Sequence, residues 1–153
     1  MHLESTIVIR RKADEVWRFL TEPLNIPKWD RGVAAVEFPA EDNPPGVGFE
    51  FTTVGHPGSG TDSGRMTYRV TAVDPEGRDC RAALISRHGN ARFVQAAEWR
   101  TVVYAAPGGS RVTISVDFHL RPRYLVLGLV LYMIAKSAGQ KDMVNLKKAL
   151  ENS

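Results

Sequence analysis

The residues that could bind a metal or act as a nucleophile are few and far apart. The four histidines, at positions 2, 56, 88 and 119, include no pair at metal-ligand spacing, and Cys80 is the only cysteine. Asp117 and His119 could form a catalytic triad with Ser115. An alternating strand would place all three on its solvent-facing side, away from any pocket. The sequence therefore predicts no metal, no other cofactor and no triad.

A second set of polar residues lies on strand faces that are otherwise apolar. Alternation along the predicted strands turns Tyr68, Gln95 and Thr101 inward. In a pocket these groups could orient a carbonyl or hydroxyl group of a ligand; elsewhere they would lie near strand ends or bond to backbone or water. We expect no Asp, Glu, His or Lys on the inward faces. This argues against general acid–base catalysis, although Tyr68 or a loop arginine could act with ordered water.

Several strands are needed to position these residues. Segment 3–10 is rich in β-branched residues and predicts a first strand. Segment 13–20 predicts a helix, because acidic residues open it and its apolar residues have helical spacing. Prolines indicate a second short helix or turn at 23–29. Period-two patterns between turn-rich segments predict further strands at 33–39, 47–54, 65–73, 79–86, 91–104 and 111–120.

A long helix is expected at the C-terminal end, over residues 124–151. Its second half has apolar or small residues on one stripe, at 135, 139, 143, 146 and 150. Gly139 lies on this stripe and could mark a bend or a close backbone approach. The apolar run from Tyr124 to Ala135 is shorter than the roughly 20 residues of a membrane-spanning helix. We interpret it as a buried helix, with contact to a membrane surface as the less favoured alternative.

These elements predict an α+β fold in a single domain, residues 1–153. Two short helices follow the first strand, and a curved seven-stranded antiparallel sheet wraps around the C-terminal helix. A pocket is expected between the sheet and that helix. The candidate ligand-binding residues are Trp29, Phe49, Phe51, Met66, Tyr68, Leu84, Phe93, Gln95, Trp99, Thr101, Ile114, Val116, Phe118, Gly139 and Met143. A one-residue bulge would invert the assignment on any strand.

The glycine-rich segment from Gly55 to Gly64 matches no phosphate-binding motif. It joins two predicted strands, so it offers no helix N-terminus to a phosphate group. We interpret it as a hairpin loop that could close over the pocket as a lid. Asp62 and Arg65 are the only charged residues in or beside it.

Composition and charge exclude several classes of protein. A chain of 153 residues with 43% hydrophobic and 24% charged residues is typical of a globular domain and not of a disordered, fibrous or disulfide-stapled chain. The net charge of +3 is scattered, so we expect no nucleic-acid partner. The single cysteine and the lack of a signal peptide favour the cytoplasm. We expect no stable membrane insertion, and either a monomer or a homodimer.

Three stretches of the chain resemble a known family. Residues 7–30 include Asn-Ile-Pro-Lys-Trp-Asp at 25–30, residues 68–75 read Tyr-Arg-Val-Thr-Ala-Val-Asp-Pro, and residues 146–151 read Leu-Lys-Lys-Ala-Leu-Glu. They resemble the opening strand and helices, the middle strand and the C-terminal helix of the polyketide cyclase/dehydrase and lipid-transport family of the SRPBCC superfamily. The resemblance covers essentially the whole chain. It implies the START-like, or Bet v 1-like, helix-grip fold.

The resemblance also implies a hydrophobic or amphipathic small-molecule ligand, which could be lipid-like, polyketide-like or aromatic. A binding or carrier protein is the preferred hypothesis, because it needs only a pocket. The alternative is a cofactor-independent enzyme of the polyketide cyclase or aromatase type that acts on a ligand in the same pocket. In a third hypothesis the basic surface binds a macromolecule. If the chain is a carrier, we expect Trp99→Ala and Gln95→Ala to weaken ligand binding while the fold survives.

Overall fold

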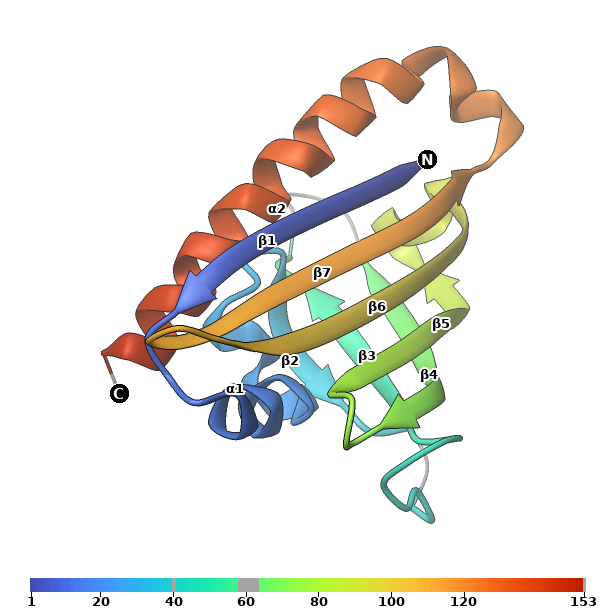
Figure 1. The fold of residues 1–153 in the computed structure, drawn as a ribbon. Coiled ribbons are helices and arrows are strands. Elements are labelled where there is room, and N and C mark those ends of the chain that lie inside the picture. Colours follow the sequence, from blue (N-terminus) through green and yellow to red (C-terminus); the bar gives the residue numbers. More distant parts are fainter. Residues whose placement is uncertain (40, 58–63, 153) are drawn as a thin grey trace.

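A curved antiparallel sheet forms the body of the computed structural model, which describes residues 1–39, 41–57 and 64–152 (Figure 1). The seven strands lie in the order β1-β7-β6-β5-β4-β3-β2, and each neighbouring pair is antiparallel. Strands β2 to β7 form a meander, and β1 pairs with β7 at one edge of the sheet. Their bounds are β1 His2–Ile9, β2 Val33–Glu37, β3 Glu50–Gly55, β4 Arg65–Asp74, β5 Asp79–His88, β6 Val94–Ala106 and β7 Gly109–Leu120.

Two short helices follow β1, as the sequence predicts. Helix α1 (Ala13–Leu20) has Asp14 and Glu15 in its first turn, where acidic side chains favour the helix dipole, and it buries Val16. The 3-10 helix η1 (Pro23–Lys28) starts with a proline, and the Glu22 carboxylate accepts a hydrogen bond from the backbone N–H of Leu24 at 3.2 Å.

Several boundaries differ from the sequence prediction. The strand predicted at 33–39 ends at Glu37, and the strand predicted at 47–54 begins only at Glu50. The strand predicted at 91–104 begins only at Val94, because the 3-10 helix η2 (Gly89–Phe93) precedes it; Gly89, at φ 62°, turns the chain out of β5. The helix predicted at 124–151 begins as the 3-10 helix η3 (Pro122–Leu127) and becomes α-helical only in α2 (Gly128–Glu151).

The core lies where α1 and the second half of α2 pack against β1, β6 and β7. Ile9, Val16, Val103, Val112 and Leu146 are almost completely buried there. Every buried residue of α2 comes from its second half: Met143, Leu146 and Leu150. These positions fall on the apolar stripe that the sequence predicts for this half.

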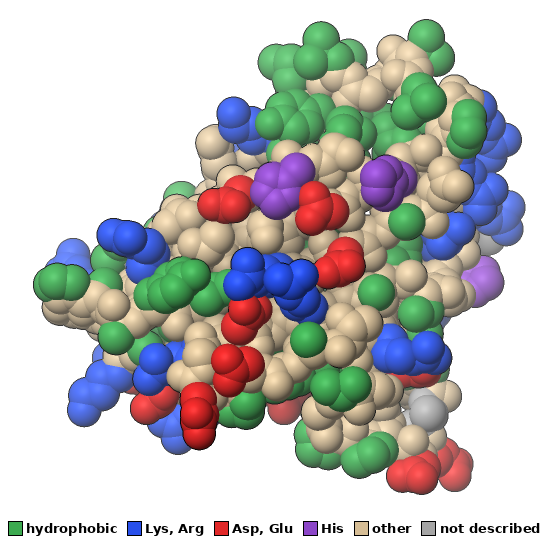
Figure 2. Space-filling view, turned by 45° about the vertical axis from the view of Figure 1, so that its right-hand side comes forward, with side chains coloured by type: hydrophobic (Ala, Val, Ile, Leu, Met, Phe, Trp, Pro, Cys, Tyr) green, Lys and Arg blue, Asp and Glu red, His purple; other side chains and the backbone are tan. Residues whose placement is uncertain are grey.

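The first half of α2 is exposed, so the prediction of a buried helix at 124–135 is wrong. Val126 is 91% exposed and Leu129 is 74% exposed. Figure 1 shows η3 and the first turns of α2 standing apart from the sheet, so nothing in the sheet covers them. Figure 2 shows hydrophobic side chains gathered at this end of the molecule. Among the described residues, no helix is long and apolar enough to cross a membrane.

Candidate ligand-binding site

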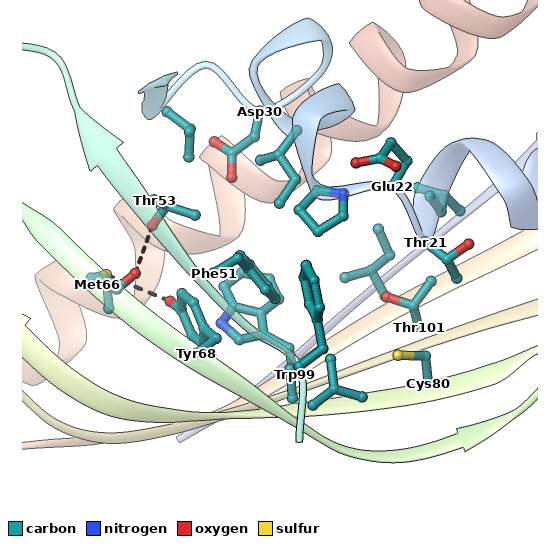
Figure 3. Close-up of a pocket in the computed structure, with 18 of the residues that line it drawn as sticks. Thr21, Glu22, Asp30, Phe51, Thr53, Met66, Tyr68, Cys80, Trp99 and Thr101 are labelled. Atoms are coloured by element: carbon teal, nitrogen blue, oxygen red, sulfur yellow. Dashed lines mark hydrogen bonds between the residues drawn. The ribbon is translucent and has the colours of Figure 1, made fainter. Parts of the chain in front are cut away.

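A cavity of about 750 Å³ lies between the concave face of the sheet and the α1–η1 segment (Figure 3). Strands β3 to β7 supply its floor, and residues of α1, η1 and η2 enclose it. Its volume falls within the roughly 300–1,000 Å³ that is usual for small-molecule pockets. Among the described lining residues none belongs to α2, so the pocket lies under α1 and η1 and not, as predicted, under the C-terminal helix.

Aromatic side chains form one wall of the cavity. Phe51 on β3 is paired directly with Tyr68 on β4, and their rings stack with centroids 5.5 Å apart. Phe49 continues the row at 6.4 Å from Phe51, and Phe38 packs edge-on against Phe49 at 5.6 Å. Such a row can stack against a flat, apolar ligand.

Tyr68 supplies a buried hydroxyl group beside this wall. Its side chain is only 5% exposed, and its hydroxyl donates to the Sδ atom of Met66 at 3.6 Å. Burial raises the pKa of Tyr68 to about 12, and the Trp99 indole partly opposes this shift. The hydroxyl therefore keeps its proton at neutral pH and can serve as a hydrogen-bond donor.

Two acidic residues that the sequence analysis did not expect line the cavity: Glu22, whose carboxylate caps η1, and Asp30. Asp30 follows η1, and Figure 3 shows its carboxyl group directed toward the space above Phe51 and Tyr68. Burial, together with the nearby charge of Asp142, raises the pKa of Asp30 to about 6, although the Gly32 backbone N–H donates to its Oδ1 at 2.8 Å. This carboxyl group can exchange a proton near neutral pH.

Asp142 comes to this region from the second half of α2. Burial raises its pKa, and the backbone N–H of Arg31, at 3.2 Å from Oδ1, opposes the shift. Asp30 and Asp142 are thus two carboxyl groups that disfavour each other's ionisation. The indole N–H of neighbouring Trp29 is buried without a hydrogen-bond partner in the part of the chain that the structure describes.

The remaining polar groups offer no nucleophile or metal site. Burial and the charge of Asp79 raise the pKa of the Cys80 thiol, which keeps it protonated and weakly nucleophilic. His56, at the cavity edge, places Nε2 3.0 Å from the carbonyl oxygen of Arg31. Within residues 1–39, 41–57 and 64–152, no group of three or more His, Cys, Asp or Glu residues could hold a metal ion.

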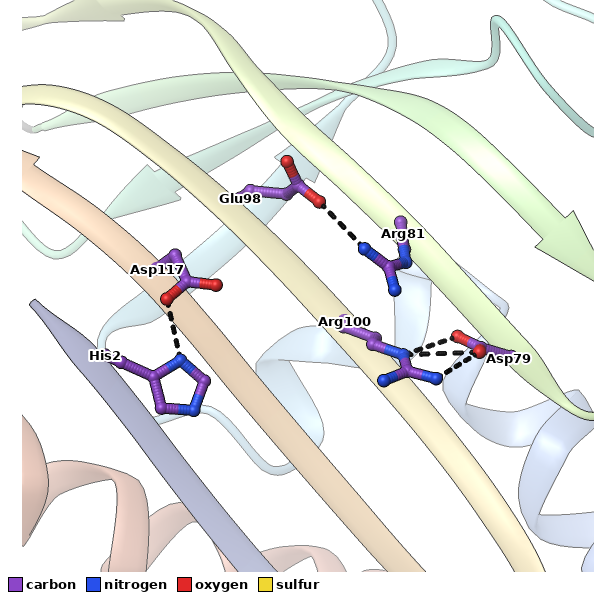
Figure 4. A network of polar contacts seen from close by, with 6 residues as sticks. All are labelled: His2, Asp79, Arg81, Glu98, Arg100 and Asp117. Atoms are coloured by element: carbon purple, nitrogen blue, oxygen red, sulfur yellow. Dashed lines mark hydrogen bonds and ion pairs between the residues drawn. The ribbon is translucent and has the colours of Figure 1, made fainter.

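The opposite face of the sheet is polar and carries ion pairs (Figure 4). The Arg100 guanidinium group binds Asp79 through two nitrogens, with Nη2 2.6 Å from Oδ2. The hydrogen bond from Arg100 in turn holds the pKa of the Asp79 carboxyl group below its usual value. His2 and Asp117 lie 2.7 Å apart on β1 and β7, and Asp117 belongs to this face and not to the cavity lining. The charged residues of this face point away from the cavity.

A comparison of the sequence with protein families identifies the family to which this chain belongs. The sequence profile of the family described as polyketide cyclase / dehydrase and lipid transport matches residues 1–151. The chain belongs to this family. A search of the curated proteins found no match.

Solved structures confirm the helix-grip fold expected of a family member. A protein from Thermus thermophilus is 15% identical, with a TM-score of 0.80 over 100% of this chain and 99% of that chain. The ZhuI aromatase/cyclase from a Streptomyces species is 18% identical, with a TM-score of 0.76 over 99% and 93%. A START superfamily protein from Mycobacterium smegmatis is 16% identical, with a TM-score of 0.65 over 99% and 94%. At these identities the likeness concerns the fold alone.

Most of the residues predicted to bind a ligand line the cavity of this family member. Alternation identified those on the strands, Phe49 and Phe93 lie just before β3 and β6, and Trp29 was predicted from its position after the second helix. They are Trp29, Phe49, Phe51, Met66, Tyr68, Phe93, Trp99, Thr101 and Ile114.

Gln95 does not reach the cavity, which corrects the sequence prediction. The pairing of β6 with β7 shifts between Val94 and Ala96, so Gln95 is the extra residue of a β-bulge and is exposed. The bulge inverts the alternation for this one residue. From Ala97 onward the predicted inward positions are correct.

Five further predicted residues also lie outside the cavity. Ile114 is the last residue of β7 at the cavity, and Val116 and Phe118 lie farther along the strand, half-buried. Leu84 is paired with Tyr68 but is half-buried outside the lining. The others are on α2, which packs against β1 instead of covering the cavity: Gly139, whose Cβ position faces Ser5, and Met143, which is in the core.

The sequence analysis missed the residues that cover the cavity. Besides Asp30, these include Trp17, Leu20 and Ile26 of the α1–η1 segment. Trp17 packs against the core as well as lining the cavity. The predicted lid includes residues 58–63, with Asp62, and these lie outside the described residues.

Proposed function

We propose that this chain binds an amphipathic small molecule in the cavity beneath α1 and η1. The observation that carries the proposal is a cavity of about 750 Å³ with an aromatic wall and with Asp30 and Tyr68 as polar groups above it. Small-molecule sites typically combine apolar walls with a few such anchors. The family and its fold support hydrophobic ligand binding as the general class.

The arrangement favours a ligand with one flat apolar part and one carbonyl or hydroxyl group. The apolar part would stack along Phe49 and Phe51, and the polar group would accept a hydrogen bond from Tyr68 or from protonated Asp30. An aromatic or polyketide-like molecule matches this description better than a simple alkyl chain does.

Tryptophan fluorescence offers a direct test, because all three tryptophans of the chain line the cavity: Trp17, Trp29 and Trp99. We expect saturable quenching by a hydroxyanthraquinone probe. Ala82, which lines the cavity, and Ala83, its neighbour on the opposite face, are a matched pair. Ala82→Leu fills cavity space and should weaken binding by about tenfold or more, whereas Ala83→Leu should not. Equal affinities of the two variants would contradict the proposal.

Native mass spectrometry of protein purified from its natural host would identify a ligand directly. A co-purifying apolar molecule of defined mass would support the carrier function and give a compound to test for turnover. The same sample of Ala82→Leu provides the control, because it should carry less of that molecule if the cavity holds it.

Acid–base catalysis of the cyclase or dehydrase type is the second candidate, and the environment of Asp30 favours it. A carboxyl group with a pKa of about 6 can act as base and as acid near neutral pH. Its carboxylate form could remove a proton from the carbon next to a ligand carbonyl. The resulting enolate carbon would attack a second carbonyl of the same ligand, and the new alkoxide would take the proton back from Asp30. Loss of water would follow: the Asp30 carboxylate would remove a second proton from the same carbon and pass it to the departing hydroxyl group, which leaves as water while the carbon–carbon double bond forms.

Asp30→Asn separates the two functions. The amide keeps the size of the side chain and an oxygen that can accept from the Gly32 N–H. In an enzyme it should lower turnover of a linear poly-β-ketone substrate by about 100-fold or more while tryptophan quenching persists. Turnover at the rate of the unmodified chain would exclude Asp30 as the acid–base group, and no turnover by either protein would leave only the binding function.

A further inference from the structure

The strongest unexplained feature is an exposed apolar surface at the start of α2. Its residues come from η3 and the first turns of the helix, and each is more than half exposed. They are Leu125, Val126, Leu127, Leu129, Val130, Met133 and Ile134, which we call the apolar tip. Isolated exposed apolar residues are ordinary, but a contiguous group of this kind on a monomer marks a contact surface.

The tip is not a poorly packed part of the core. All buried residues of α2 lie in its second half, and the tip projects from the other end of the helix (Figures 1 and 2). It is held in place by η3, where the Tyr124 ring packs against Phe93 at 6.2 Å and the Arg121 backbone N–H donates to the Phe93 carbonyl oxygen at 3.0 Å. Because Phe93 lines the cavity, the tip adjoins the cavity wall.

The charged residues in the stretch of chain that carries the tip are all positive. The stretch between Asp117 and Asp142 contains no Asp or Glu, and its charged residues are Arg121, Arg123, Lys136 and Lys141. None of these four forms an ion pair with a residue that the structure describes. Arg123 instead lies over the Tyr124 ring, with Cζ 5.0 Å from its centroid. The partner that complements this surface is apolar and negatively charged.

We propose that the apolar tip docks reversibly on the surface of a membrane that contains anionic phospholipids. Exposed apolar side chains at the end of a helix can enter the boundary between headgroups and acyl chains, and flanking cations bind the anionic headgroups. Self-association fits less well, because a two-fold interface would bring the same basic residues together without any acidic residue of this stretch to pair with them. Docking at a surface requires no spanning helix.

Vesicle co-sedimentation with the full chain tests this proposal. We expect binding to phosphatidylcholine vesicles that contain about 30% phosphatidylglycerol, little binding to phosphatidylcholine alone, and weaker binding at about 0.5 M NaCl. Val130→Asp should reduce binding by about tenfold or more, because it places a negative charge in the tip. Val144→Asp is the matched control: Val130 is 56% exposed and Val144 is 47% exposed, on the two halves of one helix. Arg121→Gln combined with Arg123→Gln should remove most of the preference for anionic vesicles.

Three outcomes would overturn the proposal. Vesicle binding could be absent or independent of anionic lipid, or Val130→Asp and Val144→Asp could lose binding equally. Sedimentation velocity could instead show a dimer that Val130→Asp dissociates, which would assign the tip to a second copy. Val126→Asp repeats the test at a side chain that is 91% exposed, and thermal melting verifies that each variant is folded. The test is independent of the cavity, because Ala82→Leu should bind vesicles normally.

Discussion

The two halves of α2 differ in an unexpected way. The more apolar half, residues 128–139, is exposed, whereas the half rich in charged residues, 140–151, packs into the core. The first half has one charged residue, Lys136, yet Leu129 is 74% exposed and Met133 is 63% exposed. The second half is rich in charged residues, yet Leu146 is completely buried and Leu150 is 3% exposed. The comparison shows that the burial of a helix depends on what faces it. Three apolar positions on one stripe are enough to bury one side of the second half against β1 and α1. The first half stays exposed although it is apolar on every side, because no other element that the structure describes faces it.

The largest effect expected from this contrast is on stability. Leu146→Ala removes a side chain from the core cluster and should lower the free energy of unfolding by about 3 kcal/mol. Leu129→Ala makes the same chemical change at an exposed position of the same helix and should change it by less than about 0.5 kcal/mol. Urea unfolding followed by circular dichroism measures both.

A loss of more than about 1.5 kcal/mol in Leu129→Ala would contradict the comparison, because it would mean that the first half of α2 is packed in the isolated chain. Addition of anionic vesicles offers a further check. If the tip docks, vesicles should raise the melting temperature of the unmodified chain, since a ligand that binds only the folded state stabilises it. Val130→Asp should lose that increase and Val144→Asp should keep it.

A smaller effect on the free energy of unfolding is expected at Asp30 and Asp142, where the packed half of α2 meets the cavity rim. Folded Asp30 keeps its proton up to about pH 6, whereas the unfolded chain releases it near the ordinary pKa of 3.8. Between these values the folded state binds more protons, so Asp30 lowers stability as the pH rises. Asp30→Asn removes this loss. Relative to the unmodified chain, the variant should gain about 1–2 kcal/mol at pH 7 and almost nothing at about pH 4.

Urea unfolding between about pH 4 and pH 7 measures this difference, and a difference that does not change with pH would refute the assignment of Asp30. Asp142→Asn sharpens the test. Removal of the Asp142 charge should move the pKa of Asp30 back toward its ordinary value, which carboxyl NMR titration of Asp30 would detect. Asp117→Asn, on the opposite face of the sheet, should leave the pKa of Asp30 unchanged.

The sequence predicted those features that depend on local pattern. Alternation placed Phe51 and Tyr68 on the same face correctly, because their strands pair without interruption at that point. Gln95 was placed wrongly, since a bulge depends on the partner strand and leaves no clear signal in the sequence. Asp30 was missed because it follows η1 and belongs to no alternating strand, although its place directly after Trp29, a predicted ligand-binding residue, was a usable signal. The exposure of the α2 start could not be predicted, because it depends on where the sheet ends.

The smallest expected effect is at Gly139, where the two halves of α2 meet. A glycine inside a helix is less favourable than alanine by roughly 0.5–1 kcal/mol. In this chain a Cβ atom at position 139 would lie 3.2 Å from Ser5 Oγ on β1, so the contact would offset part of the gain. We therefore expect Gly139→Ala to stabilise the Ser5→Ala variant by about 0.5–1 kcal/mol and the unmodified chain by less. Urea unfolding of the four proteins measures this coupling. Equal gains in both backgrounds would mean that α2 does not approach β1 closely at this point, and that the packed half begins only beyond Gly139.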